Sequence, residues 1–154
     1  MKTLRTLTML TICALLLSLN LSCTDPSSAS LSWYEGAAGY ERAAQEWKQS
    51  HAPAFIYFHT DWCHFCREFE RELLSKTEVK EYLQNVVKVR INPEAGRKDQ
   101  EIAAMFGVAG YPAIFMLPSG ATKAVPLARH KKVAGQWALM SPTEFVQACK
   151  SASQ

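Results

Sequence analysis

The sequence lacks a net charge of any size. Its 154 residues include 17 Lys and Arg against 14 Asp and Glu, and Lys2 and Arg5 are the only charged residues in positions 1–23. The rest of the chain, with 15 basic and 14 acidic residues, is therefore close to neutral. Binding to nucleic acid or to an anionic membrane surface relies on an excess of basic residues. The charge balance thus gives no case for either partner.

The sequence also lacks an apolar run that would clearly span a membrane, which takes about 20 residues. Its main apolar stretch runs from Leu7 to Leu21 and follows the charges of Lys2 and Arg5. A short positive end before an apolar centre predicts an export signal over residues 1–23, with a retained anchor helix as the alternative. We therefore expect the protein in an oxidising compartment, on the periplasmic or cell-envelope side of a bacterial membrane.

Cys23 ends this leader, directly after Ser22. The junction resembles a bacterial lipoprotein signal, in which the cysteine becomes the lipidated first residue. Ser22 fits that pattern, whereas Asn20 stands where leucine is usual, and cleavage within residues 27–30 is the alternative. Residues 24–32 are rich in serine and predict a flexible tether, followed by a folded domain over residues 33–154. Contact with a membrane is expected only through this lipid anchor.

The folded part shows no internal repeat and no second domain boundary. Its apolar runs predict strands at 54–58, 86–91 and 113–117, and residues 121–133 are expected to return as an antiparallel strand. Helical spacing predicts helices at 40–49, 63–75 and 99–106, a short helix capped by Thr77, and a last helix that begins in the capping box Ser141-Pro142-Thr143-Glu144. This order indicates an α/β fold with one mixed sheet.

Two cysteines lie where the strand at 54–58 gives way to a helix. They form the motif Trp62-Cys63-His64-Phe65-Cys66. Two cysteines separated by two residues at a helix start can close a small disulfide ring, and the helix N-terminus favours a thiolate at the first of them. Cys63 is therefore expected to be the nucleophile that forms a mixed disulfide with a substrate, and Cys66 the thiol that resolves it.

The same pair could instead be a structural disulfide or a metal site. Structural zinc takes four ligands, and no remaining cysteine or histidine has the spacing to complete such a set with Cys63 and Cys66. A copper(I) carrier needs only two thiolates and stays as an alternative. Haem attachment is excluded because Arg67, and not histidine, follows Cys66. Cys149 is expected to be a buried apolar residue of the last helix, and residues 130–132 a solvated basic turn.

The segment from Phe55 to Glu72, centred on the cysteine motif, resembles the thioredoxin superfamily, and in particular the exported proteins related to the C-terminal domain of DsbD. Gly107-Val108-Ala109-Gly110-Tyr111-Pro112 supports the resemblance, because thioredoxins keep a cis-proline before a strand at this place. The resemblance implies a thioredoxin-like fold, a central mixed β-sheet flanked by helices. It also implies a cis bond between Tyr111 and Pro112, beside the redox pair, where a bound peptide can pair with the backbone.

Two departures from the family pattern concern proton and charge balance at the cysteines. Tyr57 stands where thioredoxins carry a buried aspartate. Glu68 matches a glutamate of the DsbD-like domains and is therefore the candidate for proton transfer to and from Cys66. The alternative is that Glu68 is a solvated carboxylate on the helix surface. His64 replaces the glycine of thioredoxin and, when protonated, would stabilise the Cys63 thiolate. Trp62 is expected to be an exposed contact for substrate.

These observations predict an exported thiol–disulfide oxidoreductase whose only cofactor is the Cys63–Cys66 disulfide. Its partners would be protein thiols and disulfides together with a membrane electron donor. Two other classes stay open: a copper-delivery module, and an interaction protein that traps partners without turnover. The sequence does not set the direction of electron flow, because this depends on the reduction potential of the pair and on the partner that recharges it.

Overall fold

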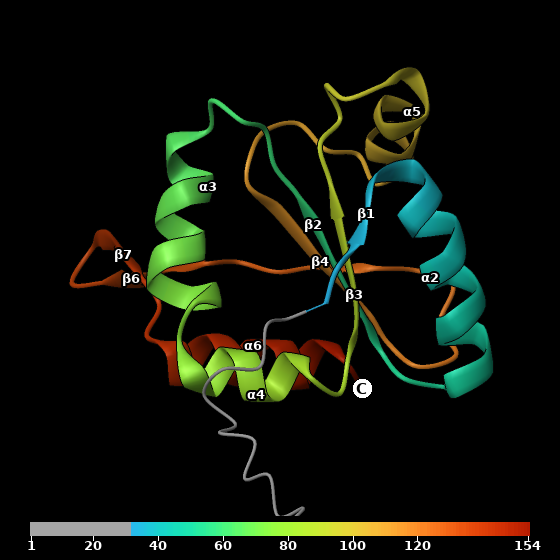
Figure 1. Ribbon diagram of the computed structural model, residues 1–154. Coiled ribbons are helices and arrows are strands. Elements are labelled where there is room, and N and C mark those ends of the chain that lie inside the picture. The colour runs from blue at the N-terminus through green and yellow to red at the C-terminus, as the bar shows by residue number, and fades with distance from the viewer. Residues whose placement is uncertain (1–31) are drawn as a thin grey trace, which may run out of the picture. The chain divides into compact units, whose positions relative to one another are not determined.

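The computed structural model describes residues 32–154, which form one α/β unit. The predicted leader over 1–23, the lipidation site Cys23 and all but the last residue of the predicted tether lie outside this range. In Figure 1 the unit is a mixed sheet with helices on both faces. None of its helices is both long enough and apolar enough to cross a membrane.

The central sheet has the strand order β1-β3-β2-β4-β5. Its strands are β1 (Tyr34–Glu35), β2 (Ala54–Phe58), β3 (Val87–Ile91), β4 (Ala113–Leu117) and β5 (Val125–Pro126). β3 runs parallel to β1 and β2, whereas β4 runs antiparallel to β2 and β5. The strands predicted at 54–58 and 113–117 are confirmed with the same ends, and the strand predicted at 86–91 begins one residue later.

Successive side chains of β2 point to opposite faces of the sheet and enter two different cores. Phe55 and Tyr57 enter a core with Phe69, Leu73, Phe145 and Cys149, and this face is covered by α3 (His64–Phe69), a π-helical turn (Glu70–Leu74), α4 (Thr77–Leu83) and α6 (Pro142–Ala152). Ile56 and Phe58 enter a second core under α2 (Gly36–Ser50) and α5 (Arg97–Met105). Since every β2 residue is buried, the continuous apolar run reflects a strand covered on both faces.

The helices occur where the sequence predicts them, with different ends. The helix expected at 40–49 begins at Gly36, and the one expected at 99–106 begins at Arg97. The predicted role of Thr77 is wrong: Lys76 is the N-cap of α4, no side chain caps it, and Thr77 is the first helical residue. The capping box of α6 is confirmed in full, with Ser141 and Glu144 in the expected roles.

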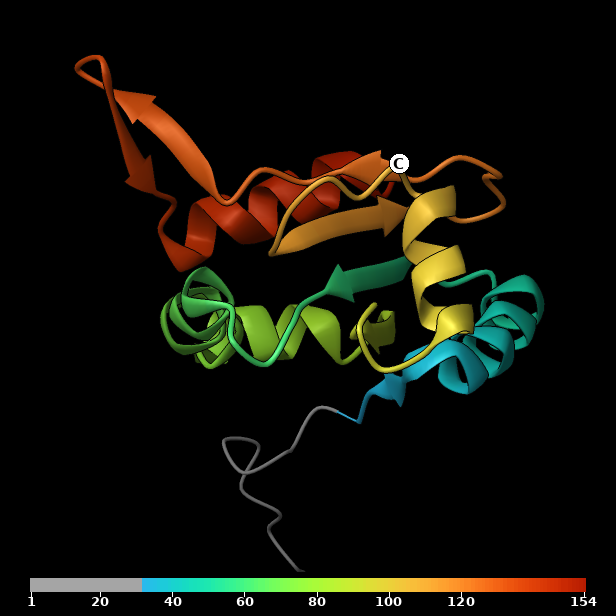
Figure 2. The same cartoon turned by 90° about the horizontal axis from the view of Figure 1, so that it is seen from above.

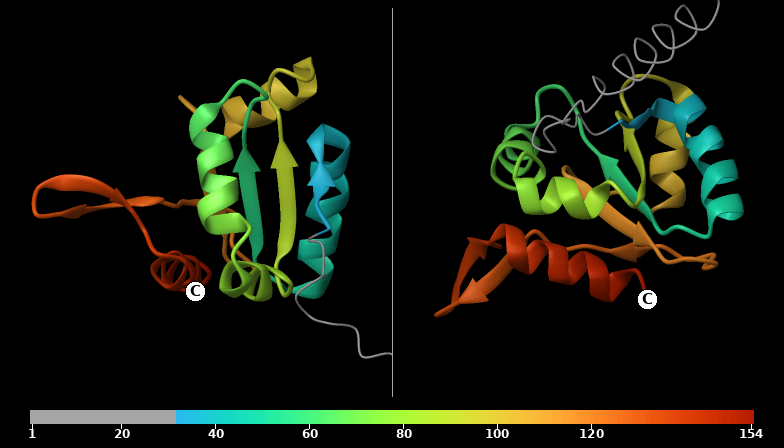
Figure 3. Two further views of the ribbon diagram at one scale, coloured as in Figure 1. Left: turned by 60° about the vertical axis from the view of Figure 1, so that its left-hand side comes forward. Right: turned by 60° about the horizontal axis from the view of Figure 1, so that its bottom comes forward.

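The region before α6 differs most from the prediction. Of the expected strand at 121–133, Val125 and Pro126 form β5 against β4, and a hydrogen bond from the Leu127 N–H extends this pairing by one residue. The chain then forms a hairpin of β6 (His130–Val133) and β7 (Gln136–Leu139), so the expected basic turn at 130–132 is a strand. Ala134 and Gly135 both have positive φ, as a two-residue hairpin turn requires. Figures 2 and 3 show this hairpin projecting away from the sheet.

Candidate functional site

The two cysteines of the motif form a disulfide at the start of α3, directly beyond the carboxyl end of β2. Cys63 and Cys66 are joined by an S–S bond of 2.07 Å. Cys63 is the N-cap residue of α3, and its Sγ accepts a hydrogen bond from the Cys66 backbone N–H at 3.0 Å. An N-cap sulfur receives both a free N–H group and the positive end of the helix, which favour negative charge there in the reduced state.

Burial does not distinguish the two cysteines in the disulfide state. Cys63 is 3% exposed and Cys66 is 2% exposed, so both cysteines lie equally out of contact with solvent. The two positions differ in helix geometry instead. Only Cys63 stands at the N-cap, whereas Cys66 lies inside the first turn of α3. The chemical asymmetry of the pair therefore comes from the helix end.

The second motif lies beside the same end of the sheet. The Tyr111–Pro112 bond is cis, as the sequence predicts, and β4 begins at the next residue. Phe58 is the register partner of Ala113, and Phe58 is also the last residue of β2 before the cysteine loop. The antiparallel pairing thus brings the residue after Pro112 to the strand end that leads to Cys63.

Two exposed aromatic side chains flank the cysteine pair. Trp62 is 65% exposed, its indole N–H donates to the Glu94 carboxylate at 3.0 Å, and its ring centroid lies 6.2 Å from that of Tyr111. Phe65 is 55% exposed. Large exposed aromatic residues next to a reactive pair are typical of a contact surface, and Glu94 is a partner of Trp62 that no sequence pattern indicated.

Tyr57, which stands where thioredoxins carry a buried aspartate, forms a hydrogen bond with a carboxylate. Tyr57 is fully buried, and its hydroxyl donates to the Glu70 carboxylate at 3.0 Å. Burial, reinforced by the Glu70 carboxylate, raises the pKa of Tyr57 well above its usual range, so the phenol stays neutral. His59 stacks on Tyr57 with 5.4 Å between ring centroids, and burial lowers the pKa of His59. Glu70 is thus the carboxylate bonded to Tyr57, and the sequence analysis did not single it out.

The other polar residues predicted near the cysteines lie closer to solvent. His64 is exposed, with its ring centroid 5.8 Å from that of Phe65. Glu68 is half-buried, and the negative charge of its carboxylate favours the charged form of Arg129. Arg129 in turn lies over Phe65, with its Cζ 5.5 Å from the ring centroid. Arg129 is distant in sequence from the motif, which explains why the motif alone did not reveal it.

No metal centre is built around these residues. Among residues 32–154, no group of three or more His, Cys, Asp or Glu side chains is arranged to bind a metal ion. Cys149 is fully buried under the sheet, as predicted, and burial raises the pKa of its thiol to about 12. Cys149 is therefore a neutral thiol within the core.

The arrangement around Cys63 defines a thioredoxin-fold protein with a cysteine pair that can form a disulfide. A family model described as thioredoxin-like, Thioredoxin_7, matches residues 32–119. Since the match covers more than half of the chain, the chain belongs to this family. None of the curated proteins compared with the chain matches it.

Solved structures agree with this family. A structure titled DsbH Oxidoreductase shares 25% identity and a TM-score of 0.61, over 86% of this chain and 92% of that one. The oxidised C-terminal domain of DsbD from Neisseria meningitidis shares 18% identity and a TM-score of 0.60, over 79% of this chain and 99% of that one. A thioredoxin from Thermus thermophilus shares 22% identity and a TM-score of 0.59, over 80% and 87%. The last two likenesses show the fold alone.

Proposed function

We propose that the protein is an exported thiol–disulfide oxidoreductase that reduces or exchanges disulfides in exported proteins. The observation that carries this proposal is the Cys63–Cys66 disulfide at the N-terminus of α3, with the Cys63 sulfur at the N-cap. A closed pair at this place can be opened to a dithiol without rearranging the sheet, because the two cysteines are neighbours on one helical turn. Thiolate attack on a substrate disulfide is the chemistry that this geometry favours.

The proposed reaction moves two electrons and two protons. In the reduced protein the Cys63 thiolate attacks one sulfur of a substrate disulfide, and the other substrate sulfur leaves as a thiol after it takes up a proton. The Cys66 thiol loses its proton and attacks Cys63, which breaks the mixed disulfide and releases the second substrate thiol. The Cys63–Cys66 disulfide that results is the redox group of the protein, and no further cofactor takes part.

Residues around the pair would hold the substrate and move the protons. Trp62 and Tyr111 supply an aromatic contact surface, and Pro112 leaves the backbone beside the pair available to an extended peptide. Glu68, half-buried on α3, stays the proposed proton carrier for Cys66. His64 contributes positive charge next to Cys63 when it is protonated.

The cellular setting of this activity rests on the sequence. Residues 1–23 would direct export, Cys23 would become the lipidated N-terminus, and residues 24–32 would space the domain from a bacterial membrane on its periplasmic or cell-envelope side. A membrane electron donor would then keep the cysteine pair reduced, and protein disulfides would be the substrates.

Insulin reduction in the presence of dithiothreitol tests the activity. The domain over residues 33–154 should accelerate insulin precipitation, and Cys63→Ser should abolish the acceleration. A copper(I) titration of the reduced domain should accompany this assay. Tight binding of one copper ion without insulin reduction would favour the copper-delivery alternative, and stable mixed disulfides without turnover would favour the partner-trapping alternative.

A further inference from the structure

A groove of about 360 Å³ lies between the cis-proline and the projecting hairpin. Its lining includes Pro112 and Ile114 on the sheet side, Leu127, Arg129 directly before the hairpin, and the hairpin residues His130 and Trp137. The groove therefore connects the end of the sheet that carries the cis-proline with the hairpin β6–β7. No residue of the predicted site other than Pro112 lines it.

The groove exists because β5 covers only part of the outer edge of β4. Within residues 32–154, β5 pairs with β4 at Phe115 and Met116, and the Leu127 N–H donates to the Ile114 carbonyl at 2.8 Å. The chain then turns away into the hairpin. Ahead of Ile114 the outer edge has no strand partner among these residues, and it presents the Pro112 carbonyl as an acceptor but no N–H, because proline lacks one and Ala113 pairs with Phe58 of β2. An unpaired strand edge is a template for an added, extended peptide.

Arg129 gives this groove a cationic wall next to the cysteine motif. Its guanidinium lies over the Phe65 ring at 5.5 Å. Its Nε atom is buried and has no hydrogen-bond partner among residues 32–154. A buried donor without a partner costs free energy, and an incoming acceptor would remove that cost. Glu68 favours the charged form of Arg129, so the wall keeps its positive charge although burial lowers the pKa. A carboxylate is the acceptor that suits it best.

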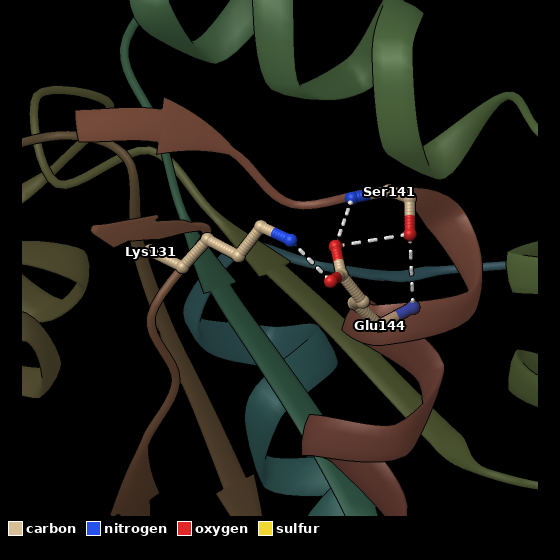
Figure 4. A network of polar contacts seen from close by, with 3 residues as sticks. All are labelled: Lys131, Ser141 and Glu144. Atoms are coloured by element: carbon tan, nitrogen blue, oxygen red, sulfur yellow. Dashed lines mark hydrogen bonds and ion pairs between the residues drawn. The ribbon is translucent and has the colours of Figure 1, made fainter. Parts of the chain in front are cut away.

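Trp137 gives the groove an aromatic wall further from the cysteines. It is 69% exposed on β7, opposite Lys132, whose ammonium lies 5.4 Å from the centre of the indole ring. The arm that carries it is fixed at its base. The Met140 N–H donates to the Arg129 carbonyl at 2.9 Å, and Lys131 pairs with Glu144 of the α6 capping box (Figure 4). The indole is thus presented by an anchored hairpin, and such rigid aromatic residues are typical binding anchors.

We propose that the β6–β7 hairpin is a substrate-docking arm for an extended, acidic segment of a disulfide-bonded polypeptide. The segment lies along the open edge of β4 with its cysteine at Cys63, a carboxylate side chain near that cysteine pairs with Arg129, and an apolar side chain further along packs on Trp137. This inference rests on the proposed function and adds a substrate class to it.

Reduction rates of matched synthetic peptides test this proposal. Each ten-residue peptide carries one intramolecular disulfide, and the positions one and two residues from each cysteine hold Glu, Gln or Lys in turn. With dithiothreitol as electron donor, at least one glutamate peptide should be reduced about tenfold faster than its lysine counterpart, as expected for one charge-assisted hydrogen bond in a half-buried site. The comparison uses a ratio, because both peptides meet the same cysteine pair and any change in its reactivity cancels.

Three variants assign the preference to the groove. Arg129→Gln should bring the ratio of glutamate to lysine peptide close to one, and Trp137→Ala should remove a separate preference for leucine over serine further along the peptide. Arg67→Gln is the matched control, because Arg67 is an exposed arginine beside Cys66 that donates to the Asp61 carbonyl and does not line the groove. It should keep both preferences.

The outcomes separate this proposal from the one on which it rests. If the native protein reduces insulin but treats the glutamate and lysine peptides alike, or if Arg129→Gln keeps the ratio, the docking arm is refuted and the oxidoreductase stands. If it reduces neither insulin nor any peptide, both are refuted. If circular dichroism shows that Arg129→Gln does not fold, the salt dependence of the native protein provides the test. Its ratio of glutamate-peptide to lysine-peptide reduction rates should fall as NaCl rises from 50 mM to 500 mM. A ratio that is constant with salt refutes the charge pair.

Discussion

At the scale of single residues, Tyr57 changes the expected chemistry of the site most. Thioredoxins carry a carboxylate at this position, and its absence would leave the core beneath the cysteines without an acid. The structure instead supplies Glu70 one helical turn after Cys66, with Tyr57 as its hydrogen-bond donor. Where thioredoxins carry the carboxylate itself, this chain thus has a phenol that is hydrogen-bonded to a carboxylate of the π-helical turn after α3.

Replacing Tyr57 with phenylalanine measures this hydrogen bond. The substitution keeps the ring in the core and removes the donor to Glu70, so the free energy of unfolding should fall by about 1 kcal/mol. Tyr34→Phe is the control, because Tyr34 also donates to a glutamate, Glu46, but at an exposed position where water can replace the bond. Urea unfolding of both variants should show the larger loss for Tyr57→Phe; equal losses would contradict the buried role of the pair.

Charges beside the cysteines can be ranked by their burial. His64 is exposed, so its effect on the reduction potential should be at most about 20 mV, since an exposed charge contributes about 1 kcal/mol or less and 30 mV corresponds to about 1.4 kcal/mol. Arg129 is half-buried over Phe65 and should contribute more. The positive charge of Arg129, and that of His64 when it is protonated, favour the thiolate, which the reduced state alone carries.

The reduction potential of the domain, measured against glutathione, checks this ranking. The native value should lie above that of thioredoxin, which is about −270 mV. His64→Ala and Arg129→Gln should both lower it, the second by more than the first. A native value at or below that of thioredoxin would contradict the expected stabilisation of the Cys63 thiolate. A larger shift for His64→Ala than for Arg129→Gln would show that the exposed charge and not the half-buried guanidinium dominates.

At the scale of elements, the α6 capping box joins the last helix to the hairpin. Glu144 accepts hydrogen bonds from the Ser141 N–H and hydroxyl, the Ser141 hydroxyl accepts the Glu144 N–H, and Lys131 of β6 pairs with the same carboxylate (Figure 4). The bond from Lys131, followed by those from Ser141, lowers the pKa of Glu144 to about 2. The carboxylate therefore stays charged in the folded state at a pH where it would be protonated in the unfolded chain.

This difference predicts a pH-dependent contribution to stability. Because the folded pKa is below the unfolded one, the contribution of Glu144 is present above the ordinary glutamate value of about 4.3 and is lost as the pH falls toward 2. Thermal unfolding of the native protein and of Glu144→Gln should therefore differ at pH 6 and converge near pH 2. Ser141→Ala should cost about 1 kcal/mol as a lost cap. A stability gap between native and Glu144→Gln that is the same at both values would contradict the charged network.

Elements differ in how far the sequence determines them. The strand at Ala54–Phe58 could be predicted with its ends because its five consecutive apolar residues are rich in strand formers and follow Pro53. The hairpin could not, because His130-Lys131-Lys132 is polar and most of β6 and β7 is not buried. Pro126 has no N–H for the sheet and precedes the point where the chain leaves β4. The local polarity of residues 130–132 favours a turn, whereas the two-residue turn at Ala134-Gly135 joins β6 and β7 in the structure.

The candidate site likewise contains residues that the sequence could predict and residues that it could not. Cys63, Cys66 and Pro112 could be predicted because a fixed spacing and a position before a strand mark them. Arg129 and Trp137 could not, since both lie in a segment without a motif and reach the groove only through the hairpin. Glu70 lies on the predicted helix, but its partner Tyr57 becomes visible only when the helix is packed on the sheet.

At the scale of the whole molecule, the features that bear on disulfide exchange gather at one end of the sheet. The disulfide follows β2, the cis-proline precedes β4, and the hairpin borders the groove beside them. The face of the sheet under α2 and α5 is occupied by the second apolar core. We therefore expect a substrate disulfide to meet the protein at this end of the sheet, with the Cys63 sulfur as the attacking atom.

Trapping of mixed disulfides tests this central claim most directly. Cys66→Ser removes the resolving thiol, so partners attacked by Cys63 should accumulate as mixed disulfides that dithiothreitol reduces. Peptide mapping should locate the intermolecular disulfide at Cys63. Cys63→Ser should give almost no such complexes under the same conditions, because Cys66 lies inside the helix turn and lacks the N-cap position. Equal trapping by the two variants, or complexes that map to Cys149, would contradict the account.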